Sequence, residues 1–145
     1  MIDRSFSAPA GRLAARRPGP ARVLLVEDDA ALQELIADYL REEGYEVVSA
    51  CTVAEAIRSL RQKPVDLVLA DSLWAPAWAA AGDRWSRLEQ VRAAAGDTPV
   101  VIFTAYDADD FADFAQRGFR DLVLKPVTLG YLCHVVARHI RVAPS

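Results

Sequence analysis

Three adjacent carboxylates follow a run of four apolar residues near the start of the chain, in the sequence VLLVEDD at positions 23–29. Carboxylates this close repel one another, and they are tolerated in water or around a cation that prefers oxygen ligands. An alternative is that Glu27, Asp28 and Asp29 only cap the following helix, because acids are favoured at an N-cap and in a first helical turn.

Three other polar residues also follow apolar runs, namely Asp71, Thr104 and Lys125. A short apolar run without alternation is typical of a strand that is buried on both faces in a parallel sheet. The carboxyl ends of such strands meet at one edge of the sheet, where open α/β folds place their sites. We therefore expect these three residues to share that edge with Glu27 and Asp28.

This set of side chains can bind a metal ion and react with phosphorus. Glu27, Asp28 and Asp71 offer only oxygen ligands, a set that suits Mg²⁺ better than zinc. Asp71 can also act as a nucleophile and form an aspartyl phosphate, while the metal neutralises charge on the phosphoryl group. Lys125 can pair with Asp71 or with a phosphate oxygen, and Thr104 can donate its hydroxyl to the phosphate.

Five apolar runs alternate with five stretches of helical periodicity. We expect strands at about 23–26, 45–50, 65–70, 99–103 and 121–124, and helices at 30–43, from Thr52 to Pro64, and at 83–95, 108–116 and 128–142. This alternation predicts right-handed βαβ units and an α/β fold, a doubly wound five-stranded parallel sheet with five helices.

The bulk composition limits the class of protein. A chain of 145 residues is long enough for one domain with a sizeable core, and its net charge of −3 gives no reason to expect direct nucleic-acid binding. No apolar run approaches the length of a membrane span. Cys51 and Cys133 lack metal-ligand spacing and suggest free thiols in a reducing compartment.

The first twenty residues differ from the rest of the chain. They contain four arginines, one acid, three prolines and two glycines, so we expect residues 1–20 to form a basic, flexible N-terminal arm. A transit peptide is the alternative that this composition leaves open. The folded domain is expected at 21–143.

From about residue 21 to 142 the chain resembles the receiver domain of two-component response regulators. The matching pieces are VLLVEDD at 23–29, DLVLAD at 66–71, TPVVIFTA at 98–105 and DLVLKP at 121–126. The resemblance implies the strand order 2-1-3-4-5 of chemotaxis-type receivers. Because the chain ends directly after the last predicted helix, we expect a single-domain protein of this type.

The resemblance also implies a role for each matching residue around the metal. Asp71 is the expected phosphoacceptor. Asp28 is the expected direct Mg²⁺ ligand, with Glu27 acting through water. Leu73, two positions after the acceptor, is expected to offer its backbone carbonyl to the metal. Asp29 matches no metal-binding position and is expected in the first turn of the next helix.

Further residues match the phosphoryl-binding positions of the family. Thr104 is the expected switch hydroxyl, Ala105 the small residue that leaves room for the phosphoryl group, and Lys125 the paired lysine. Lys125-Pro126 is a candidate for a cis peptide bond, which aims the lysine.

Two stretches depart from the family pattern. The loop after Asp71 contains about three additional residues and carries Trp74 and Trp78, which can cover the site, pack on a helix or face a partner. Leu122 stands where receivers commonly have Tyr or Phe. The output can therefore run through this loop or through Tyr106, unless Tyr106 is only an exposed loop aromatic.

The function implied is a switch controlled by phosphorylation. A histidine kinase or a histidine phosphotransfer protein would phosphorylate Asp71 with Mg²⁺, and the change would alter binding to a downstream protein target. The chain would be no enzyme beyond its own aspartyl phosphorylation and dephosphorylation. A homodimer through the helix at 108–116, the fifth strand and the last helix is a candidate assembly, and bacterial cytoplasm is the expected location.

One alternative is a receiver-like adaptor or dimerisation module that works without phosphorylation through the Trp-rich loop. The complete set of five site residues argues against it, because an adaptor does not need Glu27, Asp28, Asp71, Thr104 and Lys125. A phosphatase that uses an aspartate nucleophile is a weaker alternative, because no second catalytic acid is placed to release product.

Overall fold

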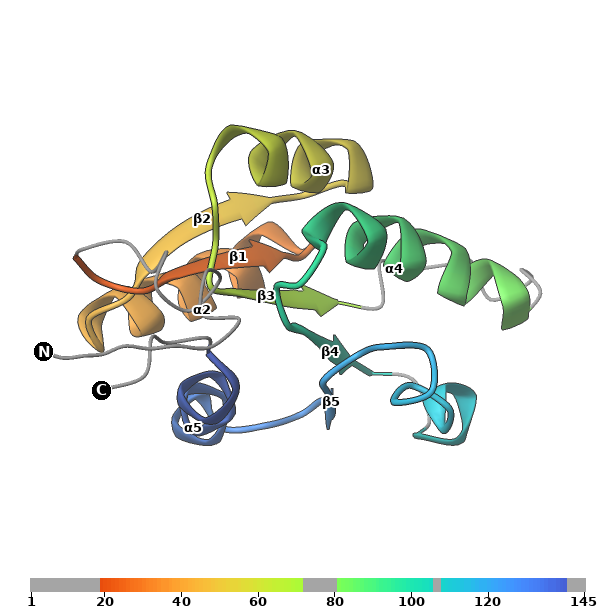
Figure 1. Cartoon of the computed structure of the whole chain (residues 1–145). Coiled ribbons are helices and arrows are strands. Elements are labelled where there is room, and N and C mark those ends of the chain that lie inside the picture. The colour runs from red at the N-terminus through yellow and green to blue at the C-terminus, as the bar shows by residue number, and fades with distance from the viewer. Residues whose placement is uncertain (1–18, 72–80, 106–107, 141–145) are drawn as a thin grey trace, which may run out of the picture.

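The computed structural model describes residues 19–71, 81–105 and 108–140, which form a parallel sheet covered by helices on both faces (Figure 1). The strands are β1 (Arg22–Val26), β2 (Glu46–Ala50), β3 (Leu67–Asp71), β4 (Val100–Thr104) and β5 (Asp121–Leu124). The α-helices are α2 (Ala30–Glu42), α3 (Val53–Gln62), α4 (Ala81–Ala95) and α5 (Leu129–His139). The strand order β2-β1-β3-β4-β5 confirms the predicted doubly wound fold.

Each strand alternates between two apolar cores, because successive side chains of a strand point to opposite faces. On one face, strand residues such as Val68 and Ile102 pack with Ala56 of α3 and Leu88 of α4. On the other face, residues including Leu69, Val101 and Phe103 pack with Ile36 of α2 and Val136 of α5. Burial on both faces explains why the inner strands β1, β3 and β4 are nearly continuous apolar runs.

Side-chain caps begin three of the helices. The side chain of Asp29 accepts a hydrogen bond from the backbone N–H of Leu32, 3.1 Å away, so Asp29 is the N-cap of α2. Thr52 and Thr128 cap α3 and α5 in the same way. Of the three adjacent acids at positions 27–29, the capping interpretation therefore holds for Asp29.

The predicted helix at 108–116 is wrong. This segment contains a 3₁₀-helix at Ala108–Phe111, which leaves four α-helices in the described residues where five were predicted. Hydrogen-bonded turns follow, such as the bond from the N–H of Phe114 to the carbonyl of Phe111, 3.0 Å long. Asp109 and Asp110 favour such turns, because short polar side chains compete for backbone groups and lower helix propensity.

Aromatic packing holds this segment against α4 in addition to its hydrogen-bonded turns. The ring of Trp85 in α4 meets Phe111 edge to face at 5.1 Å between centroids, and Phe119 lies 5.5 Å away. The guanidinium of Arg117 lies 4.3 Å from the centre of the Trp85 ring and forms a 2.8 Å ion pair with Glu89 of α4. The segment therefore belongs to the α3/α4 core although it is not an α-helix.

Helix α5 ends at His139, earlier than the predicted end near Val142. The Nε2 atom of His139 lies 2.8 Å from Oδ2 of Asp121, and Arg138 donates to the same oxygen at 3.2 Å. Burial opposes ionisation of Asp121, but the backbone N–H of Leu122 and the His139 side chain hold its pKa below the ordinary value. These contacts join the end of α5 to the start of β5.

Among the residues that the structure describes, no helix is long and apolar enough to cross a membrane.

Phe111 should contribute strongly to folding. Its side chain is fully buried, so Phe111→Ala leaves a cavity between α4 and the sheet and should lower the free energy of unfolding by about 3–5 kcal/mol. Gln116→Ala, at an exposed position of the same segment, should change it by less than about 0.5 kcal/mol. Urea denaturation followed by circular dichroism measures both. Equal effects would show that the segment does not depend on its aromatic core.

Candidate functional site

Three carboxylates meet at the carboxyl ends of two neighbouring strands. Glu27 and Asp28 follow β1, Asp71 ends β3, and one oxygen from each lies within 4.8 Å of the others. The two strands pair in parallel, with Val26 opposite Ala70, so their ends lie at the same level. Glu27 and Asp71 are 1% and 7% exposed, whereas Asp28 faces solvent. Two acids are thus fixed inside the protein and one remains open to water.

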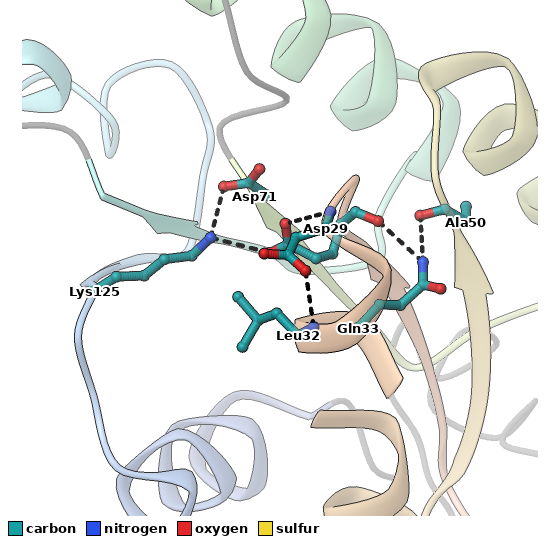
Figure 2. Close-up of polar contacts among 7 residues, drawn as sticks. Asp29, Leu32, Gln33, Ala50, Asp71 and Lys125 are labelled. Carbon is teal, nitrogen blue, oxygen red and sulfur yellow. Dashed lines mark hydrogen bonds and ion pairs between the residues drawn. The ribbon is translucent and has the colours of Figure 1, made fainter. Parts of the chain in front are cut away.

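Lys125 provides the positive charge of this cluster. Its Nζ donates to Oε1 of Glu27 at 3.0 Å and to Oδ1 of Asp71 at 3.1 Å (Figure 2). The same ammonium lies 4.7 Å from the centre of the Phe103 ring, a cation–π distance. The Lys125-Pro126 peptide bond is cis. Both carboxylates and the aromatic ring therefore hold the lysine at one position.

Burial and charge act together on the ionisation of the site. Burial first, and then the negative charge of Asp71, raise the pKa of Glu27 above its ordinary value of 4.5. Burial opposes the charge of Lys125, but Asp71 and Glu27 raise the pKa of its ammonium above 10.5. One ammonium faces three carboxylates, so ionised acids leave the site with excess negative charge.

The donor set fits a magnesium ion. All three acids offer oxygen, the exposed Asp28 leaves room for water, and the negative charge is not fully neutralised by Lys125. Mg²⁺ prefers one or two carboxylates and keeps several waters, whereas zinc prefers nitrogen and sulfur ligands. In the part of the chain that the structure describes, Glu27, Asp28 and Asp71 are the potential metal ligands whose oxygen atoms lie within 4.8 Å of one another.

The remaining predicted residues lie at different positions around this cluster. Thr104 ends β4 and is fully buried, and its carbonyl accepts a 2.7 Å hydrogen bond from the backbone N–H of Lys125. Ala105 is exposed at the same edge. Leu122 is partly buried and packs in the α3/α4 core. Leu73 and Tyr106 lie outside the described residues, as do Trp74 and Trp78.

Two residues of the site were missed in the sequence. The ring of Phe103 lies next to the Lys125 ammonium, and Phe103 pairs in register with Asp71 across β3 and β4. Gln33 donates from its side-chain nitrogen to the carbonyl of Glu27 at 3.0 Å. A polar residue beside the apolar stripe of α2 was the available signal, but helices commonly carry such residues.

Comparisons with known proteins agree with this geometry. A sequence model of the response regulator receiver domain family matches residues 23–137. Response regulator protein FleR of Pseudomonas aeruginosa is 37% identical over 120 residues, which cover 82% of this chain and 24% of that protein. Transcriptional regulatory protein GlrR of Escherichia coli is 34% identical over 109 residues, 74% of this chain and 23% of that protein. The chain thus spans about a quarter of the length of these curated relatives.

Solved structures similar to this chain are also response regulators or receiver domains. A response regulator from Thermotoga maritima superposes with a TM-score of 0.71 at 26% identity, covering 83% of this chain and 98% of that chain. The receiver domain of a sensor histidine kinase from Pseudomonas aeruginosa, solved with a magnesium ion coordinated in its active-site cleft, gives 0.67 at 27% identity. It covers 83% of this chain and 98% of its own.

The raised pKa of Glu27 predicts a pH-dependent stability difference between the wild type and Glu27→Gln. Below pH 4.5 Glu27 is protonated in both the folded and the unfolded state. As the pH rises through the raised folded pKa, the wild type loses stability because ionisation is disfavoured in the folded site. The stability of Glu27→Gln relative to the wild type should therefore increase from pH 4 to pH 7, in urea denaturation with EDTA. A difference that is constant with pH would contradict this electrostatic account.

Proposed function

Because this chain belongs to the response regulator receiver domain family, we propose that Asp71 is the phosphoacceptor of a magnesium-dependent signalling switch. The observation that carries the proposal is the cluster of Glu27, Asp28 and Asp71 within 4.8 Å, with the Lys125 ammonium bonded to two of them. A buried group of like charges is costly unless a cation compensates it, so this arrangement supports a site built for Mg²⁺ and a phosphoryl group.

The proposed reaction is phosphoryl transfer from a histidine kinase or a histidine phosphotransfer protein. A carboxylate oxygen of Asp71 attacks the phosphorus of a phosphohistidine, and the new P–O bond replaces the P–N bond. The leaving imidazole nitrogen takes the electron pair of the broken bond and a proton from solvent. Asp28 would hold Mg²⁺ directly, Glu27 through water, and Leu73 through its backbone carbonyl. The metal supplies neutralisation of charge on the transferring group.

Lys125, Thr104 and Ala105 would convert this modification into a change of shape. The Lys125 ammonium, now bonded to Asp71 at 3.1 Å, can pair with a phosphoryl oxygen once that carboxylate carries a phosphoryl group. Ala105 leaves space for the group, and the Thr104 hydroxyl donates to it. This hydrogen bond exists only in the phosphorylated state and therefore biases a two-state element.

The proposed output is a changed affinity for a downstream protein target, and the self-phosphorylation and dephosphorylation of Asp71 are the only proposed chemistry. The candidate dimer surface comprises the segment 108–116, β5 and α5. We also propose that 21–143 is the receiver unit, that 1–20 is an arm attached to it, and that the chain works in the bacterial cytoplasm.

Beryllofluoride, a phosphoryl mimic, should bind with Mg²⁺ and change tryptophan fluorescence in a saturable manner, because Trp74 and Trp78 lie within seven positions of Asp71. Asp71→Asn should abolish the change, because it removes the oxygen nucleophile. Asp38→Asn, at an exposed position of α2, is the matched control and should respond like the wild type. If the wild type gave no change and no labelling by acetyl phosphate, the phosphorylation-independent adaptor would be favoured.

Thr104→Ala should separate phosphoryl uptake from switching. The variant keeps Asp71 and the metal-binding acids, so beryllofluoride should still bind. A hydrogen bond to a charged acceptor contributes about 1.5–3 kcal/mol, so its loss should shift the switch equilibrium by about tenfold or more. Amide NMR shifts in residues 108–124 should then be small in Thr104→Ala and close to wild type in Thr104→Ser. Wild-type shifts in Thr104→Ala would exclude this hydroxyl from the readout.

A further inference from the structure

We infer that Gln33 is a positioning residue for the metal-binding acids, an inference that rests on the proposed function. Its side-chain nitrogen donates to two carbonyl oxygens, those of Glu27 and Ala50, each at 3.0 Å (Figure 2). One of these carbonyls belongs to the acidic loop and the other ends strand β2. The carboxamide thus bridges the loop that carries Glu27 and Asp28 to the edge strand of the sheet.

The loop between β1 and α2 needs such an attachment. Strand β1 ends at Val26 and α2 begins at Ala30, so Glu27 and Asp28 lie outside regular structure. The backbone N–H of Glu27 donates to the carbonyl of Ala50 at 3.0 Å, and the Asp29 side chain is already used as a helix cap. Repulsion among the carboxylates favours opening of this loop, and the Gln33 bridge opposes it.

The bridge acts on Asp28 through the planar peptide bond. The carbonyl of Glu27 and the N–H of Asp28 belong to one peptide unit and point in opposite directions in the trans form. A hydrogen bond that holds the carbonyl toward β2 therefore fixes the orientation of the whole unit. It sets the starting direction of the Asp28 backbone, from which the exposed carboxylate extends. Gln33 can thus act on the metal site without contacting the metal.

The bridge requires a side chain that donates twice. Its two oxygen partners are carbonyls, and an amide nitrogen carries two hydrogens for them. Sγ of Cys51, 3.7 Å from the same nitrogen, is a weaker third acceptor. The carbonyl of Ala50 has two lone pairs, which accept from the Glu27 backbone and from Gln33. Methionine has a similar shape but no donor, and asparagine keeps the amide on a side chain that is one methylene shorter. These two substitutions remove the bridge in different ways.

The test measures Mg²⁺ binding to the full chain by isothermal titration calorimetry. Gln33→Met and Gln33→Asn should weaken Mg²⁺ binding by about tenfold, the usual effect of losing a group that orients a metal ligand. Gln62→Met, an exposed glutamine at the end of α3, is the matched control and should bind like the wild type. Urea denaturation in EDTA, with all four proteins, verifies that each is folded.

A kinetic measurement distinguishes positioning from a merely structural role. With acetyl phosphate as donor, the Mg²⁺ concentration for half-maximal phosphorylation should rise about tenfold in both variants, while the rate at saturating Mg²⁺ stays near wild type. A lower saturated rate with an unchanged half-saturation would overturn the inference, because it would show loss of folded protein alone.

The outcomes also separate this inference from the proposed function. If the wild type binds Mg²⁺ and both variants bind it with equal affinity, the role of Gln33 is refuted and the phosphoacceptor proposal stands. If the wild type binds no Mg²⁺ and takes up no beryllofluoride, both proposals fail together.

Discussion

Repulsion among three carboxylates is the constraint on which the rest of the site depends. Glu27 and Asp71 are almost fully buried, and one oxygen of Asp28 lies within 4.8 Å of an oxygen of each, close enough for mutual repulsion. Lys125 supplies one compensating ammonium, which two ion pairs and an aromatic ring hold in place. This compensation is incomplete, and burial together with the negative charge of Asp71 raises the pKa of Glu27. The negative charge that Lys125 leaves uncompensated is the physical basis of the proposed divalent-cation site.

The strands and the edge they share were predictable because β1, β3, β4 and β5 are apolar runs with a polar residue at or directly after their carboxyl ends. Parallel pairing then leaves little freedom in where Asp71, Thr104 and Lys125 lie. The segment at 108–116 was mispredicted because its apolar spacing also fits a turn-rich chain that packs through Phe111. Gln33 was missed because its partners are backbone carbonyls, which every residue carries and no sequence pattern marks.

The two faces of the sheet divide the residues that surround the acids. Phe103 packs on the α2/α5 side, beneath the lysine, while Leu122 packs on the α3/α4 side with Phe111 and Trp85. Because side chains alternate along β4, Thr104 points to the face opposite Phe103. The aromatic ring that contacts the ammonium of the site therefore lies on the α2/α5 face of the sheet. Leu122, whose role as a readout position stays a prediction, packs on the other face and offers only apolar contacts there.

The ion pair between Lys125 and Glu27 joins residues 98 positions apart in the chain. A ribosome delivers the three acids long before it delivers β5, so a nascent chain carries the carboxylates without their ammonium. Closing a loop of this length has an entropic cost that only the nearly complete sheet can offset. The cluster is therefore assembled among the last features of the fold. A growing chain cannot pair these carboxylates with the Lys125 ammonium until β5 has been made.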